Sequence, residues 1–462
     1  MKLKKVTTAL LTAALTATTI LAAGCGDSGS ADGKKDLKVF IFADDSTKEV
    51  YQGMIDKYVK EHSDTIGSIK LQTTPKDEYV TTLKGMMTSG DMPDVLYMEP
   101  QSVADYVNNG YLASLTELMK DSDVTTDGIY ENVLDFYRYD KDSKTQGEGD
   151  LYGLPKDYSV FAYAYNKDLF DEAGIDYPDP ENPYTYEEFV EVCKKLTKDT
   201  DGDGEIDQWG AGFADTLMLY PLVWSNGGSF LSDDYKTVTI DTPEFKEAVQ
   251  KYVDLTLEYE VTPSVDQDTS LGVYQRWIAG QEAFYGCGTW EIAAMNDDAT
   301  FAYDYNLTGY PTLSTGVSYA NLGSVGFCVS DASKNKQEAL DLISYLSTDL
   351  DGQKIVSGID GNKSVQLPTI KDYAENDFVK AVEDGEVDYP SNIQIYLNYM
   401  NGTDKYQGRM PEYSYTPNPE WLTPFWDGLT TAKRGDVTVD EFIAKVQPQM
   451  QEYLDTAWEN AQ

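Results

Sequence analysis

Predicted strands and helices alternate along the first part of the chain, and this alternation restricts the fold more than any other feature. The apolar stretch 37–42 predicts a strand, and residues 47–61 place apolar side chains at helical spacing. A second strand is predicted at 69–73, a second helix at 77–89 and a third strand at 95–98. Strand–helix–strand units of this kind predict a parallel sheet with helices on its faces, which is an α/β fold.

Polar side chains follow two of these predicted strands. Asp44 and Asp45 come directly after the first strand, and Glu99 and Gln101 follow the third. Ligands of open α/β sheets bind outside the carboxyl ends of the strands. We therefore expect these four residues to contact a ligand.

The N-terminus predicts export. Lys2, Lys4 and Lys5 precede an apolar segment at 6–23, which is the pattern of a secretory signal peptide. The many threonines and small residues in this segment argue against a permanent membrane span. Residues 1–24 are therefore predicted to be a signal peptide.

The apolar segment ends in Leu21-Ala-Ala-Gly-Cys25, which resembles the lipobox of bacterial lipoproteins. In a lipobox the cysteine becomes the lipidated first residue of the mature chain; an ordinary cleavage site with a chance cysteine is the alternative. Residues 26–33 have the composition of a flexible tether. We expect residues 25–36 to anchor a soluble body to the extracellular face of the bacterial cytoplasmic membrane through lipid on Cys25.

The charge of the chain excludes some partners. The formal net charge is −43, and it becomes −46 once the three lysines of the leader are removed. Such an acidic protein repels nucleic acid and anionic lipid, whereas a neutral ligand or a cation is compatible with it. The 35 tyrosines and 7 tryptophans suit the surface of a sugar or of a peptide. The length allows two domains.

The stretch 284–292 is the strongest candidate for a binding feature. It predicts a short buried strand at 282–285 that ends at Gly286-Cys287-Gly288, and a helix that begins at Glu291. Trp290 lies between the two elements. Its ring either covers the core or forms a platform for the flat apolar face of a ligand.

Six short motifs occur in a fixed order along the body: Gly90-Asp-Met-Pro-Asp94-Val-Leu, Gly153-Leu-Pro155 with Tyr165-Asn166-Lys167-Asp168-Leu169, Asn226-Gly227-Gly228, Gly288-Thr-Trp290, Gly309-Tyr-Pro311-Thr312 and Pro424-Phe-Trp426. Each motif alone is weak. Together, behind a lipobox, they resemble the extracellular solute-binding proteins of ABC transporters, in the sugar-binding family that includes the maltose-binding protein. The resemblance covers the chain from Leu37 to the C-terminus.

The resemblance implies two α/β lobes, each a mostly parallel sheet flanked by helices, with the ligand held between them. It implies an N-terminal lobe of residues 37–156 and 310–368 and a C-terminal lobe of residues 157–309 and 369–462. Three hinge crossings would lie near 155–158, 308–313 and 365–369. A protein of this kind is a receptor that delivers its ligand to ABC permease subunits, and we expect a monomer.

The resemblance also suggests site residues. Trp290 and Trp426 match positions where relatives stack an aromatic ring on a sugar, and Tyr158 lies on a loop that lines the cleft with the acidic residues named above. Trp224, ahead of a diglycine, is a further candidate, with core packing as its alternative. A pyranose has an apolar face and a rim of hydroxyls, so aromatic rings and carboxylates together suit it. An oligosaccharide is therefore the expected ligand, and its identity stays open.

An acidic loop at 199–210 predicts a structural calcium site. Oxygen donors occupy positions 1, 3, 5, 7 and 9 of an EF-hand-like spacing, and Gly204 occupies the sixth position, where such a loop turns sharply. The twelfth position is Gly210 rather than a glutamate, so another donor would have to complete the shell. An acidic turn that binds nothing is the alternative. The expected ligands are Asp199, Asp201, Asp203, Glu205 and Asp207.

The sequence offers little support for catalysis. His62 is the only histidine, which excludes histidine-based triads, and no phosphate-binding loop or dinucleotide fingerprint occurs. Paired carboxylates of a glycoside hydrolase remain open because the chain has 79 acidic residues. We expect a binding protein rather than an enzyme, with a surface glycoside hydrolase, a non-transport adhesin and a peptide receptor as alternatives. A disulfide between two of Cys193, Cys287 and Cys328 is left open.

Overall fold

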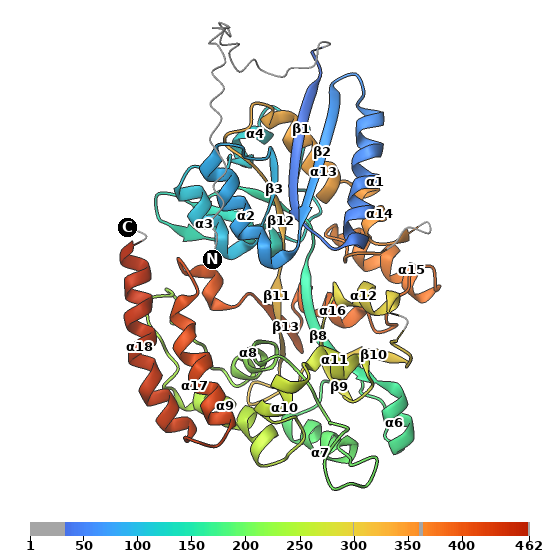
Figure 1. The fold of residues 1–462 in the computed structure, drawn as a ribbon, viewed down its shortest axis with the longest axis vertical. Helices are drawn as coiled ribbons and strands as arrows, with labels where there is room; N and C mark the ends of the chain where they lie inside the picture. Colours follow the sequence, from blue (N-terminus) through green and yellow to red (C-terminus); the bar gives the residue numbers. More distant parts are fainter. Residues whose placement is uncertain (1–32, 299, 360–363, 461–462) are drawn as a thin grey trace, which may run out of the picture.

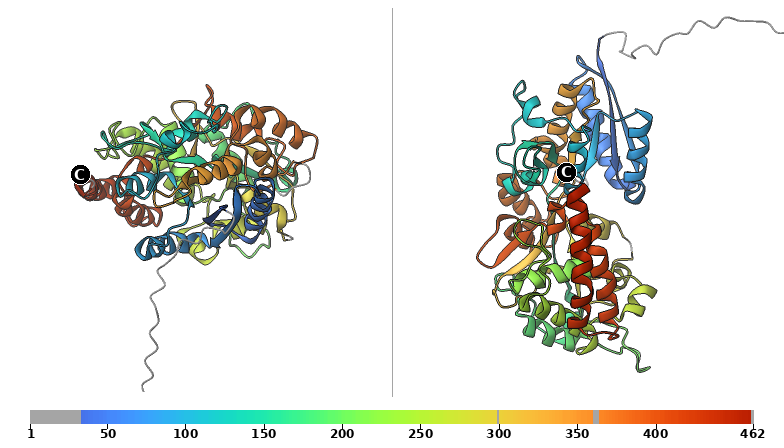
Figure 2. Two further views of the ribbon diagram at one scale, coloured as in Figure 1. Left: turned by 90° about the horizontal axis from the view of Figure 1, so that it is seen from above. Right: turned by 90° about the vertical axis from the view of Figure 1, so that its left-hand side faces the viewer.

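The computed structural model describes residues 33–298, 300–359 and 364–460. The predicted signal peptide, Cys25 and most of the predicted tether lie outside these residues. The described chain forms two lobes, each built on a five-stranded sheet with helices around it, so the predicted two-lobe α/β fold is confirmed (Figures 1 and 2). Among the described residues, no helix is both long and apolar enough to span a membrane.

The first lobe is built on a mixed sheet. Its strands, in sheet order, are β2 (Ile66–Thr74), β1 (Lys35–Phe42), β3 (Val95–Met98), β12 (Gly326–Val329) and β7 (Gly153–Pro155). The strands β2, β1 and β3 are parallel, as predicted, and β12 pairs antiparallel with both β3 and β7. The helices of this lobe are α1 (Asp45–Glu61), α2 (Lys76–Ser89), α3 (Pro100–Asn108), α4 (Leu115–Met119), α5 (Glu131–Leu134), η1 (Asp135–Tyr137), α13 (Lys336–Ser347) and α14 (Leu350–Val356). A small sheet of β5 (Thr145–Gln146), β4 (Arg138–Asp140) and β6 (Asp150–Leu151) lies beside them.

Local sequence explains where the first helices begin and which face they bury. The Asp44 carboxylate accepts the Thr47 N–H at 2.7 Å and so caps α1. Met54, Ile55 and Tyr58 bury the inner face of that helix. These side chains pack against the sheet, which leaves the N-terminus of α1 beside the carboxyl end of β1.

The second lobe surrounds the long strand β8. Its strands are β10 (Tyr305–Thr308), β8 (Ser159–Asn166), β11 (Ser318–Gly323) and β13 (Tyr406–Arg409), with β9 (Phe284–Gly288) paired to β8. Its helices are α6 (Lys167–Ala173), α7 (Tyr186–Leu196), α8 (Asp215–Ser225), α9 (Pro243–Leu257), α10 (Val265–Ser270), α11 (Val273–Ile278), α12 (Glu291–Asp297), η3 (Tyr373–Phe378), α15 (Val379–Glu383), α16 (Gln394–Asn401), η4 (Glu412–Tyr415), η5 (Glu420–Leu422), α17 (Thr423–Lys433) and α18 (Val439–Asn460).

The second sheet differs from the expected mostly parallel one. Strand β8 pairs antiparallel with β9, β10 and β11, and only β11 and β13 run parallel. The two successive strand–helix–strand units that the sequence predicts both belong to the first lobe. In the second lobe the strands are far apart in sequence, so their pairing direction depends on long connections that local patterns do not describe.

The chain passes between the lobes at places that only partly match the predicted crossings. It leaves β7 and enters β8 through residues 156–158, near the first predicted crossing. The second prediction, 308–313, is wrong: Tyr310 N–H donates to Tyr399 in the second lobe, and β11 still belongs to the second sheet. The chain crosses back at residues 324–325, between β11 and β12. The third passage follows Lys371, whose N–H still donates to Gly128 O in the first lobe.

The glycines before Trp290 lie inside a strand rather than after one. The predicted strand at 282–285 was expected to stop at Gly286, but β9 continues to Gly288, which pairs with Phe161 of β8. A Cβ on Gly288 would lie 2.7 Å from the indole of Trp290. Gly288 is therefore needed because the Trp290 ring lies directly against its backbone.

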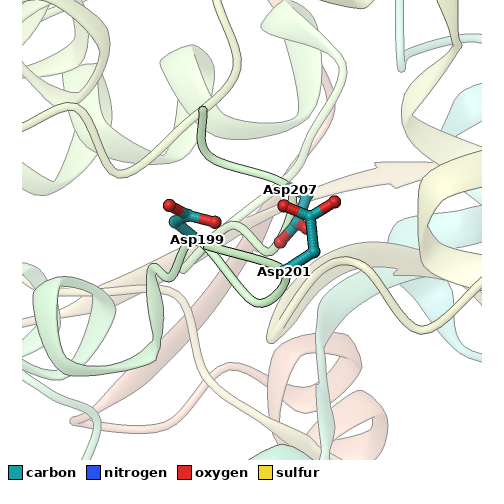
Figure 3. A group of neighbouring side chains, drawn as sticks. All are labelled: Asp199, Asp201 and Asp207. Carbon is teal, nitrogen blue, oxygen red and sulfur yellow. The ribbon is translucent and has the colours of Figure 1, made fainter. Parts of the chain in front are cut away.

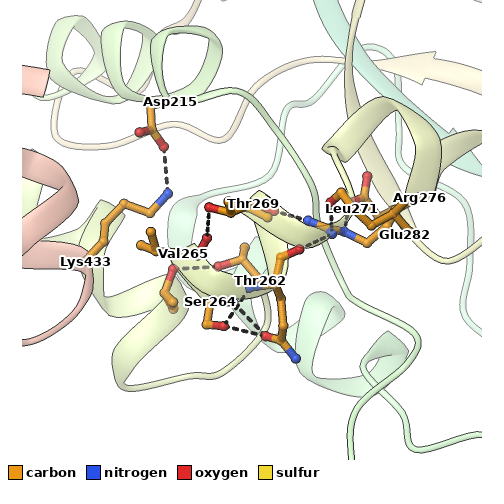
Figure 4. A network of polar contacts seen from close by, with 12 residues as sticks. Asp215, Thr262, Ser264, Val265, Thr269, Leu271, Arg276, Glu282 and Lys433 are labelled. Carbon is orange, nitrogen blue, oxygen red and sulfur yellow. Dashed lines mark hydrogen bonds and ion pairs between the residues drawn. The ribbon is translucent and has the colours of Figure 1, made fainter. Parts of the chain in front are cut away.

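A buried polar network fixes α10 and α11 to the start of β9 (Figure 4). The Arg276 Nε donates to Glu282 at 3.2 Å, and its Nη atoms donate to Asp268 and to the carbonyl of Leu271. Burial raises the pKa of Glu282, and the Arg276 charge opposes this shift. Cys193, Cys287 and Cys328 are buried, unpaired thiols, so no two of them form the disulfide that the sequence left open.

Candidate functional site

A cavity of about 600 Å³ lies between the two lobes. This volume falls within the range of ligand sites for small molecules, about 300–1,000 Å³. Its walls come from the carboxyl ends of β1 and β3, from the passages at 156–158 and 324–325, and from α8, α12 and η4 of the second lobe. The residues that line it include Phe42, Asp44, Ser46, Lys76, Glu99, Gln101, Lys156, Asp157, Ser159, Phe161, Tyr220, Trp290, Asn321, Tyr413 and Ser414.

The first-lobe wall carries three of the predicted residues. Glu99 accepts a hydrogen bond from the Gln101 amide at 3.2 Å and pairs with Lys76 at 3.0 Å. The Lys76 ammonium lies 5.5 Å from the centre of the Phe42 ring. Asp44 also lines the cavity, with its carboxylate engaged as the cap of α1. This wall therefore offers charged and amide groups whose positions are fixed by one another.

Asp45 does not line the cavity. It is the first residue of α1, one position beyond the cap, and its side chain is exposed. Asp44, Ser46 and Thr47 around it line the cavity, so the first turn of α1 leaves the Asp45 side chain directed into solvent. The prediction for Asp45 is not supported by its position, whereas the position of Asp44 agrees with the prediction.

The floor of the cavity is a buried ion pair at the passage between the lobes. Lys156 Nζ lies 2.7 Å from Asp157 Oδ2, and the side-chain exposure of the two residues is 11% and 7%. Asp157 accepts the Val325 N–H at 2.9 Å, and Lys156 N–H donates to Val325 O at 2.7 Å. Gln366 accepts from Lys156 Nζ and donates to the Lys156 carbonyl. The pair thus joins the two passages to each other.

Trp290 dominates the second-lobe wall. The Trp290 side chain is 44% exposed, whereas residues 284–289, which lead to it, are buried. Its ring meets Phe161 of β8 edge-on, with centroids 4.8 Å apart. The Glu291 carboxylate accepts the Gly288 N–H at 2.7 Å and the Tyr285 hydroxyl at 2.6 Å, so it holds the turn that presents the indole. Burial raises the pKa of Glu291.

Three predicted aromatic residues lie outside the cavity. Tyr158 is fully buried against Tyr130 and Phe136 of the first lobe. Trp224 is 1% exposed, and its Nε1–H donates to Glu412 at 3.0 Å. The Trp426 ring packs edge-on against Phe425, 5.1 Å between centroids, and it does not line the cavity.

Several cavity residues had no predicted role. Among the described residues, Ser46 Oγ, Tyr220 Oη and Asn321 Oδ1 are buried polar atoms without a hydrogen-bond partner. Buried polar groups need partners, so these atoms are suited to the hydroxyls of a ligand. Strand alternation was the available signal for Ser159 and Phe161, which line the cavity while Val160 between them is buried.

The family comparison decides the identity of the fold. The bacterial extracellular solute-binding protein family matches residues 44–350, about two thirds of the sequence. The chain belongs to this family.

Curated relatives of this solute-binding protein are distant in sequence. The lactose-binding protein of Rhizobium radiobacter is 22% identical over 75% of this chain and 78% of its own length. The arabinooligosaccharide-binding protein of Halalkalibacterium halodurans is 24% identical over 68% of this chain and 67% of its own.

Solved structures show the same fold. An ABC substrate-binding protein of Listeria monocytogenes in complex with cycloalternan has a TM-score of 0.74 at 20% identity, covering 91% of this chain and 99% of its own. The maltose/maltodextrin-binding domain MalE of Bdellovibrio bacteriovorus, bound to maltotriose, has a TM-score of 0.67 at 19% identity. The match covers 91% of this chain and 100% of that domain. Both likenesses support the two-lobe architecture of this solute-binding protein.

The acidic loop of the solute-binding protein brings three carboxylates together (Figure 3). Asp199, Asp201 and Asp207 each place an oxygen within 4.8 Å of the others, whereas Asp203 and Glu205 are not part of this group. Asp199 accepts the N–H groups of Gly202 and Gly204, which lowers its pKa. Gly204 has φ +97°, the sharp turn that the sequence places at the sixth position.

Proposed function

We propose that this solute-binding protein is a receptor that binds an oligosaccharide in the interlobe cavity and delivers it to an ABC permease for import. One observation carries the proposal: an exposed Trp290 shares the cavity with buried polar atoms that have no partner among the described residues. An indole face suits the apolar face of a sugar, and hydroxyls and amides suit its rim. The two relatives above are named for binding carbohydrates, and the two solved structures hold cycloalternan and maltotriose, which belong to the same chemical class.

Closure of the lobes would trap the ligand. A ligand that contacts both lobes favours the closed state because it gains contacts there that it lacks in the open state. Glu99 and Gln101 lie on one side, and Trp290 and Tyr413 on the other. The passage through Lys156 and Asp157 lies between them, where a hinge is needed.

A glycan panel tests this function. Purified protein would be screened by thermal shift against linear and cyclic oligosaccharides, monosaccharides, amino acids and short peptides, and each hit measured by calorimetry. We expect oligosaccharides to raise the melting temperature and to bind with one ligand per chain. If peptides bind and no glycan does, the carbohydrate assignment is wrong.

The glycoside hydrolase alternative is less well supported. The carboxylates that line the cavity are Asp44, Glu99 and Asp157. Asp44 caps a helix, and Glu99 and Asp157 are each paired with a lysine, so all three carboxylates are already engaged within the protein. A glycoside hydrolase needs two carboxyl groups that face the glycosidic bond. Chromatography of the bound oligosaccharide after long incubation tests this directly, because a hydrolase would release shorter products.

We also propose that the protein is a monomer tethered to the extracellular face of the cytoplasmic membrane by lipid on Cys25. The lipobox and the polar residues 26–33 support this proposal. Mass spectrometry of the protein from its own membrane would show a lipidated Cys25, and Cys25→Ser would release the protein into the medium. Light scattering of the soluble body tests the monomer.

A structural calcium ion in the 199–207 loop is a further proposal. The donor set is all oxygen, which suits calcium, and Asp199, Asp201 and Asp207 already converge. These three residues would hold the ion, whose charge would neutralise their mutual repulsion. None of residues 199–207 lines the interlobe cavity, so the effect of the ion is expected on stability.

A further inference from the structure

A second hollow of about 230 Å³ lies at the seam between the lobes, beyond the end of the interlobe cavity. Its walls are the middle and end of α3, the hairpin β4–β5, residues 414–417 after η4, and the last turns of α18. Figure 1 shows α18 running along the second lobe to end beside α3. Figure 2 shows the same end of the chain at the level where the lobes meet.

One face of α3 lines both hollows. Gln101 borders the interlobe cavity, and Ala104, Asp105 and Asn108 border the second hollow. These positions follow one another at helical spacing, so they form a continuous stripe along the helix. The helix therefore forms one wall that runs from the first hollow into the second.

The opposite wall is continuous as well. Tyr413 borders the interlobe cavity, Tyr415 borders the second hollow, and Ser414 borders both. Helix α3 packs against η4, so the two walls belong to one seam. A ligand that reaches Ser414 from the interlobe cavity is already at the edge of the second hollow.

The second hollow has the groups that suit a sugar. Tyr139, Tyr415 and Trp458 supply aromatic rings, and Asn108 and Gln146 supply amides. Asn108 donates to the Tyr139 hydroxyl at 2.9 Å, which leaves its amide oxygen available as an acceptor. Aromatic rings beside amides match the apolar face and hydroxyl rim of a pyranose.

Tyr235 holds two of these rings in place. Its ring stacks on Tyr415 with centroids 4.6 Å apart and an angle of 11°, and its carbonyl accepts the Trp458 Nε1–H at 3.0 Å. Its φ of +57° is in the left-handed region, which a tyrosine rarely adopts. Backbone strain of this kind persists where the surroundings enforce it, and it clusters at ligand clamps.

We propose that the binding cleft continues along α3 into the second hollow, which takes the far residues of an oligosaccharide too long for the interlobe cavity. This proposal rests on the proposed function and adds to it the length of the ligand. The receptor then selects extended chains, because only these gain contacts in both hollows.

The test is a length series of the glycan that binds best in the panel, from disaccharide to octasaccharide, measured by calorimetry. Asn108→Ala is the main variant because it removes an exposed amide without opening the core. Trp458→Ala is the second variant. Tyr453→Ala is the control, since Tyr453 is an exposed ring on α18 that lines neither hollow.

We expect both variants to weaken the long oligosaccharides at least fivefold and to change the shortest ligand less than twofold. Equal loss for all lengths would overturn the extension but leave the interlobe site intact. Unchanged binding of the long oligosaccharides by both variants would also overturn the extension. If Trp458→Ala unfolds, Asn108→Ala alone decides. Absence of glycan binding to the unmodified protein would overturn the proposed function, and this extension with it.

Discussion

The indole of Trp290 meets the ring of Phe161 at 88°, so the edge of one ring rests on the face of the other. Phe161 belongs to the central strand of the second sheet, and Trp290 follows the strand β9 that pairs with it. The indole therefore lies against the Phe161 ring and the backbone of Gly288, and the Glu291 carboxylate fixes that backbone by accepting the Gly288 N–H. A ring fixed in this way loses little conformational entropy when a ligand stacks on it.

Trp290→Ala is expected to weaken glycan binding about tenfold or more, because stacking and apolar burial of this size contribute roughly 1–3 kcal/mol. Calorimetry with the best ligand of the panel measures the loss. Tyr453→Ala is the matched control. Unchanged affinity in the Trp290 variant would remove the platform role.

Trp224→Phe is expected to lower stability rather than affinity. The substitution removes one of the side-chain donors to the buried Glu412 carboxylate and leaves the Ser229 hydroxyl as another, and the loss costs about 1–3 kcal/mol. Urea unfolding measures the loss, and calorimetry at low temperature is expected to give an affinity within about twofold of the unmodified protein. A large loss of affinity with normal stability would restore the ligand role that the sequence suggested.

Lys156→Met is expected to destabilise the protein by about 3–5 kcal/mol, because it leaves the Asp157 carboxylate buried without its cation. Adding Asp157→Asn is expected to recover part of the loss, since the amide oxygen can still accept the Val325 N–H. Lys120→Met is the control: Lys120 pairs with Glu117 in solvent, where an ion pair contributes little to stability. Similar losses for both lysines would contradict a special role for the buried pair.

A chelator is expected to lower the melting temperature, and added calcium to restore it. Asp199→Asn is expected to abolish this response because Asp199 contributes to the three-carboxylate group. Asp233→Asn, at an exposed position elsewhere in the second lobe, is expected to keep it. Identical melting of the unmodified protein with and without chelator would count against the metal site.

Glu291 is expected to make stability fall as pH rises above the ordinary glutamate pKa of about 4.3. Its raised pKa means that the folded state keeps a proton that the unfolded chain has already released, so this contribution is full below that pH and is lost as pH approaches the raised value. Glu291→Gln is expected to make the fall shallower in pH-dependent unfolding.

Glu441 serves as a comparison because its pKa is shifted in the opposite direction to that of Glu291. Its pKa is lowered by hydrogen bonds from Thr438, so its contribution is present above the unfolded pKa and is lost as pH falls. Glu441→Gln is therefore expected to weaken the protein mainly at neutral pH. If both variants change the pH profile in the same direction, the assigned environment of Glu291 is wrong.

Sequence patterns predicted the first lobe better than the second. In the first lobe, the paired strands β1, β2 and β3 follow one another along the chain, and α1 and α2 each carry an apolar face. In the second lobe, β8 pairs with β11, more than a hundred residues later. No local pattern specifies such a pairing. The crossing at 308–313 was expected from the family resemblance, whereas Tyr310 and β11 both belong to the second lobe.

Trp224 and Trp290 both lie near glycines in the sequence, but only Trp290 lines the cavity. Trp224 lies in α8, where the apolar run Leu217–Trp224 is interrupted by no charged residue, and a helix that is apolar all round is buried. Trp290 lies between a strand and a helix, where a side chain can point outward. Tyr158 differs from its neighbours for a simpler reason: Asp157 and Ser159 line the cavity, and the residue between them faces the other way.

The place of β12 in the first sheet bears on the order of folding during secretion. Within the part of the chain that the structure describes, β7 pairs in the sheet with β12 alone, and Gly326 is synthesised 171 positions after Pro155. The first lobe therefore stays incomplete until most of the second lobe has been made. A chain with such late, distant pairing folds slowly. We expect this delay to keep the precursor open to the export machinery, so that the receptor completes its fold only where it is needed.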